Sequence, residues 1–95
     1  MSFRLSRRAG IDLRRIYFAS ARLFGPAQAD RYSRRLRRAI ELIARNPQLA
    51  HERQDLSPPV RVHPCGSHII IYIIENDADV LILRIRHARE DWAKD

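Results

Sequence analysis

The chain has 95 residues, of which 45% are hydrophobic and 31% are charged, and its net charge at pH 7 is +7. This length supports one domain with one modest core and leaves no room for a separate cofactor domain. No stretch resembles a signal peptide, a membrane-spanning helix or a lipidation site, so we expect a single domain in the cytoplasm with no membrane partner.

The positive charge is concentrated in the first half of the chain. Residues 1–50 carry twelve arginines and three acidic residues, a net charge of +9, whereas residues 51–95 carry a net charge of −2. Such a field attracts either nucleic acid or an acidic protein. Arginine outnumbers lysine by seventeen to one. This slightly favours a partner whose carboxylates or phosphates accept paired hydrogen bonds, although a GC-rich genome gives the same bias.

The pattern of the first half predicts a short strand followed by two helices. Residues 3–5 form the strand, and Ser6 offers a side-chain oxygen that caps a helix beginning at Arg7. Gly25-Pro26 ends this helix and starts the next, because glycine tolerates a positive φ and proline suits a first helical turn. The second helix ends near Asn46-Pro47, since the residue before proline disfavours helical geometry. Two helices joined so tightly should form an antiparallel hairpin.

Each predicted helix carries one apolar stripe at helical spacing, which we expect to be buried. The first stripe consists of Ala9, Leu13, Ile16, Tyr17, Ser20 and Phe24. The second stripe consists of Ala29, Tyr32, Leu36, Ala39, Ile40 and Ile43.

The second half of the chain predicts three strands. A polar loop over residues 47–59 leads to a strand at 60–63, a turn at 64–67, and a strand at 69–74 whose isoleucines require cover on both faces. A turn at Asn76-Asp77 leads to the last strand, residues 80–87. The order is β-α-α-β-β-β with a C-terminal tail, which places the fold in the α+β class as a helical hairpin packed on a mainly antiparallel sheet.

Strict alternation along the last strand predicts two different faces. Leu81, Leu83 and Ile85 would share one face. Val80, Ile82, Arg84 and Arg86 would share the other, so that one end of the second face is charged. Arg84 and Arg86 are candidates for pairing with Glu75, Asp77 or Asp79 across the hairpin, and the Glu90-Asp91 pair can equally satisfy nearby arginines.

Three apolar residues fall outside the buried stripes, namely Ile11 and Phe18 in the first helix and Leu42 in the second. The arginines around them are Arg7, Arg14, Arg15 and Arg22 in the first helix and Arg35, Arg38 and Arg45 in the second. Apolar residues ringed by arginine suit an amphipathic partner that brings apolar side chains and carboxylates together. The alternative is that these are ordinary scattered surface residues.

Cysteine and histidine give no sign of a metal or cofactor site. Cys65 has no cysteine partner, and His51 lies in the long loop without ligand companions, so we expect neither metal nor cofactor. His63 and His68 flank a turn and should be solvated. His87 ends a strand and is more often bonded to backbone than catalytic. Trp92, with Ala93, should pack against the end of the sheet.

A set of short motifs runs along nearly the whole chain in a fixed order. They are Leu5-Ser6 with Ala9, Asp12-Leu13 with Ile16, Phe24-Gly25 with Gln28-Ala29, Ile43-Ala44 with Asn46-Pro47, then Arg61, His68 with Tyr72, and Ile82-Leu83-Arg84-Ile85 with His87, Arg89 and Trp92. In this order and spacing they resemble the ParE branch of the RelE/ParE toxin superfamily. The resemblance implies that residues 1–95 form one RelE/ParE-like toxin domain.

The resemblance also implies a function. It implies a growth-inhibiting toxin of a bacterial type II toxin–antitoxin pair, held in a hetero-oligomeric complex by a ParD-like antitoxin encoded beside it. The implied target is DNA gyrase, and DNA itself would be contacted only through the antitoxin. We expect the antitoxin on the arginine-ringed helical surface and the target on Arg84, Arg86, His87 and Trp92.

The RelE branch of the same superfamily cleaves messenger RNA on the ribosome, and this remains the alternative. Such cleavage needs a base, an acid and cations on the phosphate, for which Arg61, His63, Arg84 and His87 are the candidates. The strands carry no lysine, although RelE-like enzymes often use lysines, and Ala88 stands where some of that branch have an aromatic residue. We therefore expect a protein-binding inhibitor with no catalytic residues. A third possibility is a basic nucleic-acid-binding or antitoxin-binding module without toxicity.

Overall fold

The computed structural model describes residues 2–76 and 78–92. Its elements are β1 (Phe3–Leu5), α1 (Arg7–Phe24), α2 (Pro26–Arg45), the 3₁₀ helix η1 (Pro47–Leu49), β2 (Glu52–Arg53), β3 (Val60–Cys65), β4 (His68–Glu75) and β5 (Asp79–His87). The predicted order is confirmed, and the structure adds η1 and β2 within the segment predicted as a polar loop. Asp77 and Ala93 lie outside the described residues. No helix in the described part is long and apolar enough to cross a bilayer.

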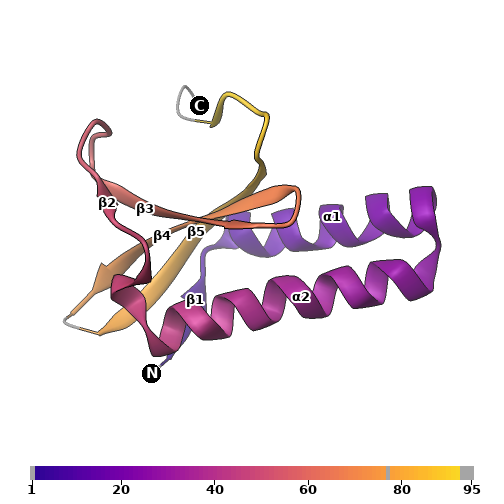
Figure 1. Ribbon diagram of the computed structural model, residues 1–95, viewed down its shortest axis with the longest axis horizontal. Helices are drawn as coiled ribbons and strands as arrows, with labels where there is room; N and C mark the ends of the chain where they lie inside the picture. The colour runs from indigo at the N-terminus through magenta and orange to yellow at the C-terminus, as the bar shows by residue number, and fades with distance from the viewer. Residues whose placement is uncertain (1, 77, 93–95) are drawn as a thin grey trace.

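The two helices form the predicted hairpin. Ser6 caps α1, since its Oγ accepts a hydrogen bond from the Ala9 N–H at 3.0 Å. Gly25 takes a φ of +90° between the helices, and Pro26 occupies the first turn of α2. The helices run side by side along one face of the sheet, and the end of the hairpin near Gly25 extends beyond it (Figure 1).

The sheet has the strand order β1-β5-β4-β3-β2. β1 runs parallel to β5, and every other pairing is antiparallel. β1 pairs with β5 only at Val80, Leu81 and Ile82, so among the described residues the rest of β5 has no neighbouring strand on that side. This open stretch of β5 is where the candidate site lies.

The isoleucine strand is covered on both faces, as predicted. Ile70 and Tyr72, both fully buried, pack with the helices in the main core. Ile69 and Ile71 belong to a second apolar cluster that includes Val60. Five half-buried apolar residues pack against this second cluster, namely Leu56, Val62, Ile73, Leu83 and Trp92. Trp92 therefore packs on the sheet, as predicted.

The predicted alternation along β5 is wrong beyond Ile82. Ile71 pairs with Arg84 and Tyr72 pairs with Ile82, so Leu83 is an extra residue in β5. Such a bulge reverses which side chains face the helices. Ile85, only 3% exposed, therefore joins Val80 and Ile82 in the main core, while Leu83 packs on the outer cluster.

The predicted stripe of α2 is confirmed, since its six residues are buried or half-buried. The prediction for α1 is wrong at its end, because Phe24 is 62% exposed and the adjacent Leu23 is 70% exposed. The sheet stops short of this last turn, so nothing in the described chain covers it (Figure 1). The α1 stripe is bordered by an acid, Asp12, which is 8% exposed.

Candidate functional site

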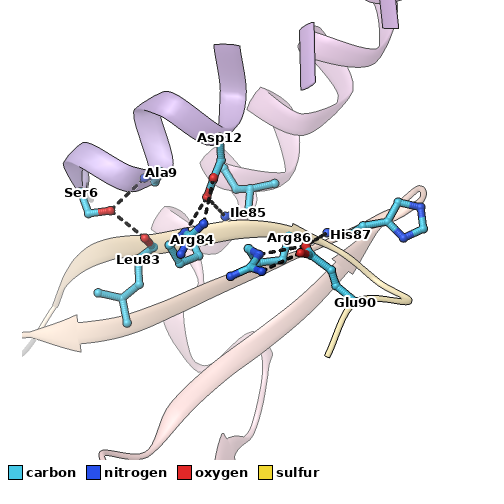
Figure 2. A network of polar contacts seen from close by, with 9 residues as sticks. All are labelled: Ser6, Ala9, Asp12, Leu83, Arg84, Ile85, Arg86, His87 and Glu90. Atoms are coloured by element: carbon cyan, nitrogen blue, oxygen red, sulfur yellow. Dashed lines mark hydrogen bonds and ion pairs between the residues drawn. The ribbon is translucent and has the colours of Figure 1, made fainter. Parts of the chain in front are cut away.

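The open stretch of β5 is closed by side chains in place of a neighbouring strand (Figure 2). The Ser6 Oγ donates to the Leu83 carbonyl at 2.7 Å. An Asp12 carboxylate oxygen accepts the Ile85 N–H at 3.0 Å, and a Glu90 oxygen accepts the His87 N–H at 3.0 Å. These three contacts satisfy backbone groups that an additional strand would otherwise use.

Asp12 also forms a buried ion pair with Arg84. The Arg84 Nε lies 2.8 Å from Asp12 Oδ2, and its second nitrogen lies 3.2 Å from Oδ1, so the pair is bidentate. The Asp12 side chain is 9% exposed and that of Arg84 is 25% exposed. The predicted pairing of Arg84 across the hairpin is wrong, because Arg84 pairs with Asp12 of α1 instead. Glu75 instead pairs with Arg4 at 2.6 Å.

Arg86 and Glu90 form a second bidentate pair, with distances of 2.9 and 2.6 Å, which confirms the local pairing of Glu90. The hydrogen bond from Arg86, aided by the His87 N–H, lowers the pKa of Glu90 from 4.5 to about 2. His87 Nδ1 accepts the Arg89 N–H at 3.1 Å, so the ring makes the backbone contact expected of a strand-end histidine. The neutral ring then carries its proton on Nε2.

His68 is half-buried and hydrogen-bonded to Tyr32, whereas the prediction left it solvated. Its Nδ1 lies 2.6 Å from the Tyr32 hydroxyl, and its ring centroid lies 5.4 Å from that of His87. The Tyr32 oxygen also accepts the Ser67 N–H at 3.1 Å. Burial lowers the pKa of His68, and the neighbouring His87 lowers it further. Burial also lowers the pKa of His63, which is half-buried.

These depressed pKa values predict a loss of stability in mild acid. A histidine whose folded pKa lies below 6.5 stabilises the fold fully above pH 6.5, and this contribution is lost as the pH falls through the folded value. Between pH 7.5 and 5.5, urea unfolding of the wild type should therefore show a larger loss of stability than His68→Gln shows. Glu90 does not contribute in this range, because its carboxyl titrates below pH 4.5.

The control is His51→Gln, because His51 is exposed in a loop. This variant should keep the wild-type pH dependence. An equal pH dependence in the wild type and His68→Gln would contradict the burial of a neutral His68.

Two cavities flank this region. One, of about 490 Å³, lies between α1 and β5 and is lined by Ile11, Arg15, Arg84 and Arg86 among others. The other, of about 590 Å³, lies under the end of the hairpin. Its walls are Leu23 and Phe24 on one side and His68 and His87 on the other.

The predicted helical surface is accessible but is not one patch. Its arginines, together with Phe18 (66% exposed) and Leu42 (41% exposed), lie at the surface, and Ile11 is half-buried. Ile11 faces the cavity beside β5. Leu42 lies on the other helix, about 120° around its axis from Asp30. Asp30 marks the side of α2 that faces α1, since it accepts a hydrogen bond from Tyr17. The set therefore divides into a β5 side and an α2 side.

The predicted target-binding residues also lie in two separate places. Arg84, Arg86 and His87 together line a third cavity, of about 280 Å³. Trp92 lies apart from them on the outer cluster, where the Arg53 guanidinium is 5.6 Å from its ring centroid.

The structure does not bring the four candidate catalytic residues together. Arg61 and His63 lie on β3, whereas Arg84 and His87 lie on β5, with β4 between them. Strand spacing alone separates the two pairs by about 10 Å. Arg61 donates to the Ala50 carbonyl at 2.6 Å, and Arg84 is held by Asp12. Within residues 2–76 and 78–92, no three His, Cys, Asp or Glu residues are grouped as metal ligands.

Sequence reasoning missed the contacts of Asp12 and Tyr32, and it missed the bonds of Ser6 and Glu90 to the backbone of β5. One signal was available, because Asp12 borders the predicted buried stripe of α1, and a buried acid requires a partner. The identity of that partner was not accessible, since Arg84 is 72 residues away.

The geometry defines an α+β fold in which a helical hairpin packs on a mainly antiparallel sheet, and side chains of Ser6, Asp12 and Glu90 close the open sheet edge. The chain belongs to the ParE toxins of type II toxin–antitoxin systems, parDE, whose family model matches residues 3–92.

Known relatives agree with this assignment. The chain is 36% identical over 85 residues to Toxin ParE1 of Caulobacter vibrioides, covering 90% of this chain and 86% of that protein. It is 30% identical over 87 residues to Toxin ParE1 of Mycobacterium tuberculosis H37Rv, covering 92% and 89% respectively. A solved structure titled as a chromosomal ParDE TA system from P. aeruginosa matches with a TM-score of 0.79 at 22% identity, covering 92% of this chain and 95% of that one. This last likeness supports the fold.

Proposed function

We propose that this toxin inhibits DNA gyrase by binding it, without enzymatic chemistry, and that a ParD-like antitoxin neutralises it in the cytoplasm. One observation supports an inhibitor without enzymatic activity. Strand β4 separates Arg61 and His63 from Arg84 and His87. Cleavage of RNA needs a base, an acid and phosphate-binding cations around one reacting phosphate. A set divided between two non-adjacent strands supports binding in preference to cleavage.

The gyrase contact in this proposal consists of Arg84, Arg86, His87 and Trp92. The first three share a cavity, and the two arginines among them provide guanidinium groups whose directions are fixed by Asp12 and Glu90. Trp92 adds an aromatic side chain at the other face of the sheet. Gyrase would therefore approach the end of the sheet from which the C-terminal tail leaves.

mRNA cleavage as in the RelE branch is the second candidate function, and one observation favours it. His87 lies beside Arg84, Arg86 and His68 at one cavity, which brings imidazole groups and cations close together. This arrangement would use a set different from the one predicted by sequence, without Arg61 or His63.

The antitoxin in this proposal contacts the helical hairpin on both its β5 side and its α2 side. The surface consists of Ile11, Arg14, Arg15, Phe18 and Arg22 of α1 and of Arg35, Arg38, Leu42 and Arg45 of α2. Exposed Phe18 and Leu42 accept apolar side chains, and the surrounding arginines, including Arg15 in the cavity next to Ile11, accept carboxylates. An acidic amphipathic segment satisfies both requirements.

Charge reversal at Arg14, Arg15 and Arg38 together should weaken antitoxin binding at least tenfold, because each new glutamate repels a carboxylate of the partner. Titration calorimetry of the toxin with its antitoxin would measure this loss. The matched control reverses Arg31, Arg34 and Arg37, which are exposed on α2 outside the proposed surface. The control should lose clearly less affinity. Equal losses would mean that only net charge matters, which would contradict the proposed surface.

A further inference from the structure

α2 exposes a row of arginines along its outermost line. At 100° per residue, Arg31, Arg34, Arg38 and Arg45 fall within an arc of about 60° on the side opposite Leu36. Leu36 is 1% exposed, whereas all four arginines are exposed. Arg31 and Arg45 lie about 21 Å apart along the axis, at 1.5 Å per residue. We call these four residues the arginine row.

The arginine row has no counter-charge in the described chain, since none of its four residues forms an ion pair there. The two acids of α2 are engaged on the flank of the helix. Asp30 bonds to Tyr17, and Glu41 pairs with Arg37 at 3.4 Å. Arginines elsewhere in the chain, such as Arg84 and Arg86, are held by carboxylates. The row is thus a line of unneutralised positive charge on a rigid element.

We propose that the arginine row binds the phosphate backbone of double-stranded DNA, a proposal that rests on the proposed action on gyrase, because gyrase works on duplex DNA. Duplex DNA carries one negative charge per about 1.7 Å of its axis, so a row of about 21 Å meets phosphates along its whole length. Guanidinium groups suit phosphate oxygens because they donate paired hydrogen bonds. This differs from the expectation that DNA is contacted only through the antitoxin.

Arg38 and Arg45 also belong to the proposed antitoxin surface, but the composition of the row as a whole favours DNA over an acidic protein. Protein interfaces are centred on buried apolar and aromatic side chains, whereas backbone contacts to DNA need only cations and polar groups. The other residue on this outer arc is Ala27, and the nearest large apolar side chain, Leu42, lies about 20° beyond Arg31 at the edge of the arc. The outer line of α1 differs, because Ile11 and Phe18 interrupt its arginines. Single-stranded nucleic acid is also disfavoured, since it is held largely by stacking on aromatic rings, which the row lacks.

The test is fluorescence anisotropy of a labelled 24-base-pair DNA duplex titrated with purified toxin between 50 and 200 mM NaCl. The logarithm of the binding constant falls with the logarithm of salt by about 0.9 per phosphate contacted. If all four arginines contact phosphates, the variant R31Q/R34Q/R38Q/R45Q should reduce the magnitude of this slope by about 3.6. Glutamine retains helix propensity close to that of arginine, so α2 should persist. Circular dichroism of the variant would verify this.

The matched control is R7Q/R14Q/R15Q/R22Q, which removes the same charge from α1. This variant should keep most of the wild-type slope. Equal slopes in the two variants would overturn the proposal, because binding would then follow net charge alone. Tighter binding of an RNA duplex, or binding of a polyglutamate peptide in place of DNA, would also overturn it. The proposed function is assayed separately by gyrase supercoiling with wild-type toxin. If the toxin inhibits gyrase but R31Q/R34Q/R38Q/R45Q keeps the wild-type salt slope, the DNA inference is wrong while the proposed function stands.

Discussion

Replacing Asp12 with alanine should lower the free energy of unfolding by about 3 kcal/mol. Removing one member of a buried ion pair costs about 3–5 kcal/mol, because the remaining charge is left uncompensated. The lower end of this range applies to Asp12→Ala, because the Arg84 side chain is 25% exposed and can regain some hydration. The change also removes the acceptor of the Ile85 N–H. Urea unfolding followed by circular dichroism would measure the loss.

Two further variants separate the ion pair from a general effect of removing an aspartate. Asp30→Ala removes an exposed carboxylate that bonds to Tyr17, so it should cost less than about 1 kcal/mol. The double variant D12A/R84M should recover part of the loss, because no buried charge remains unpaired. A cost for Asp12→Ala as small as that of Asp30→Ala would show that the pair does not hold the edge of β5.

Gly66→Ala should destabilise the protein by about 2–3 kcal/mol. Gly66 has a φ of +60°, a conformation that costs other residues roughly 1–2 kcal/mol. A Cβ at this position would lie 2.8 Å from the Tyr32 ring and its hydroxyl. The ring would have to move, which weakens its hydrogen bonds to His68 and Ser67, each worth about 1 kcal/mol.

Gly10→Ala should instead stabilise the protein. A Cβ there meets no atom within 4 Å, and the residue lies inside α1, where alanine is favoured over glycine by about 0.5–1 kcal/mol. Thermal unfolding of the two variants in parallel would therefore show one lowered and one raised midpoint. A Gly66→Ala variant as stable as wild type would mean that Tyr32 does not anchor the β3–β4 turn.

The fold was predictable from the sequence because its signals are local. The Ser6 cap, the Gly25-Pro26 junction and the isoleucine run each define an element from neighbouring residues alone, and all three elements form as predicted. The apolar stripe of α2 also predicted its buried face correctly. The exposed end of α1 was not predictable in the same way, because the stripe does not reveal where the sheet beneath it stops.

The details of the site depend on long-range geometry that periodicity does not contain. The extra residue Leu83 reverses the facing of Ile85, and strict alternation has no signal for such a bulge. The partners of Asp12 and Tyr32 lie 72 and 36 residues away in the chain. For the same reason, the division of the predicted target residues between two faces of the sheet became visible only in three dimensions.

The most direct test of the central claim is a supercoiling assay with purified gyrase, run beside a ribosome-dependent mRNA cleavage assay. Both assays would use toxin freshly released from its antitoxin, and the toxin–antitoxin complex would serve as the control. A gyrase inhibitor without enzymatic chemistry should block supercoiling, leave the mRNA intact, and lose its effect when the antitoxin is restored. Cleavage of mRNA with supercoiling unaffected would contradict the account and would assign the chemistry to the histidines and arginines at the end of β5.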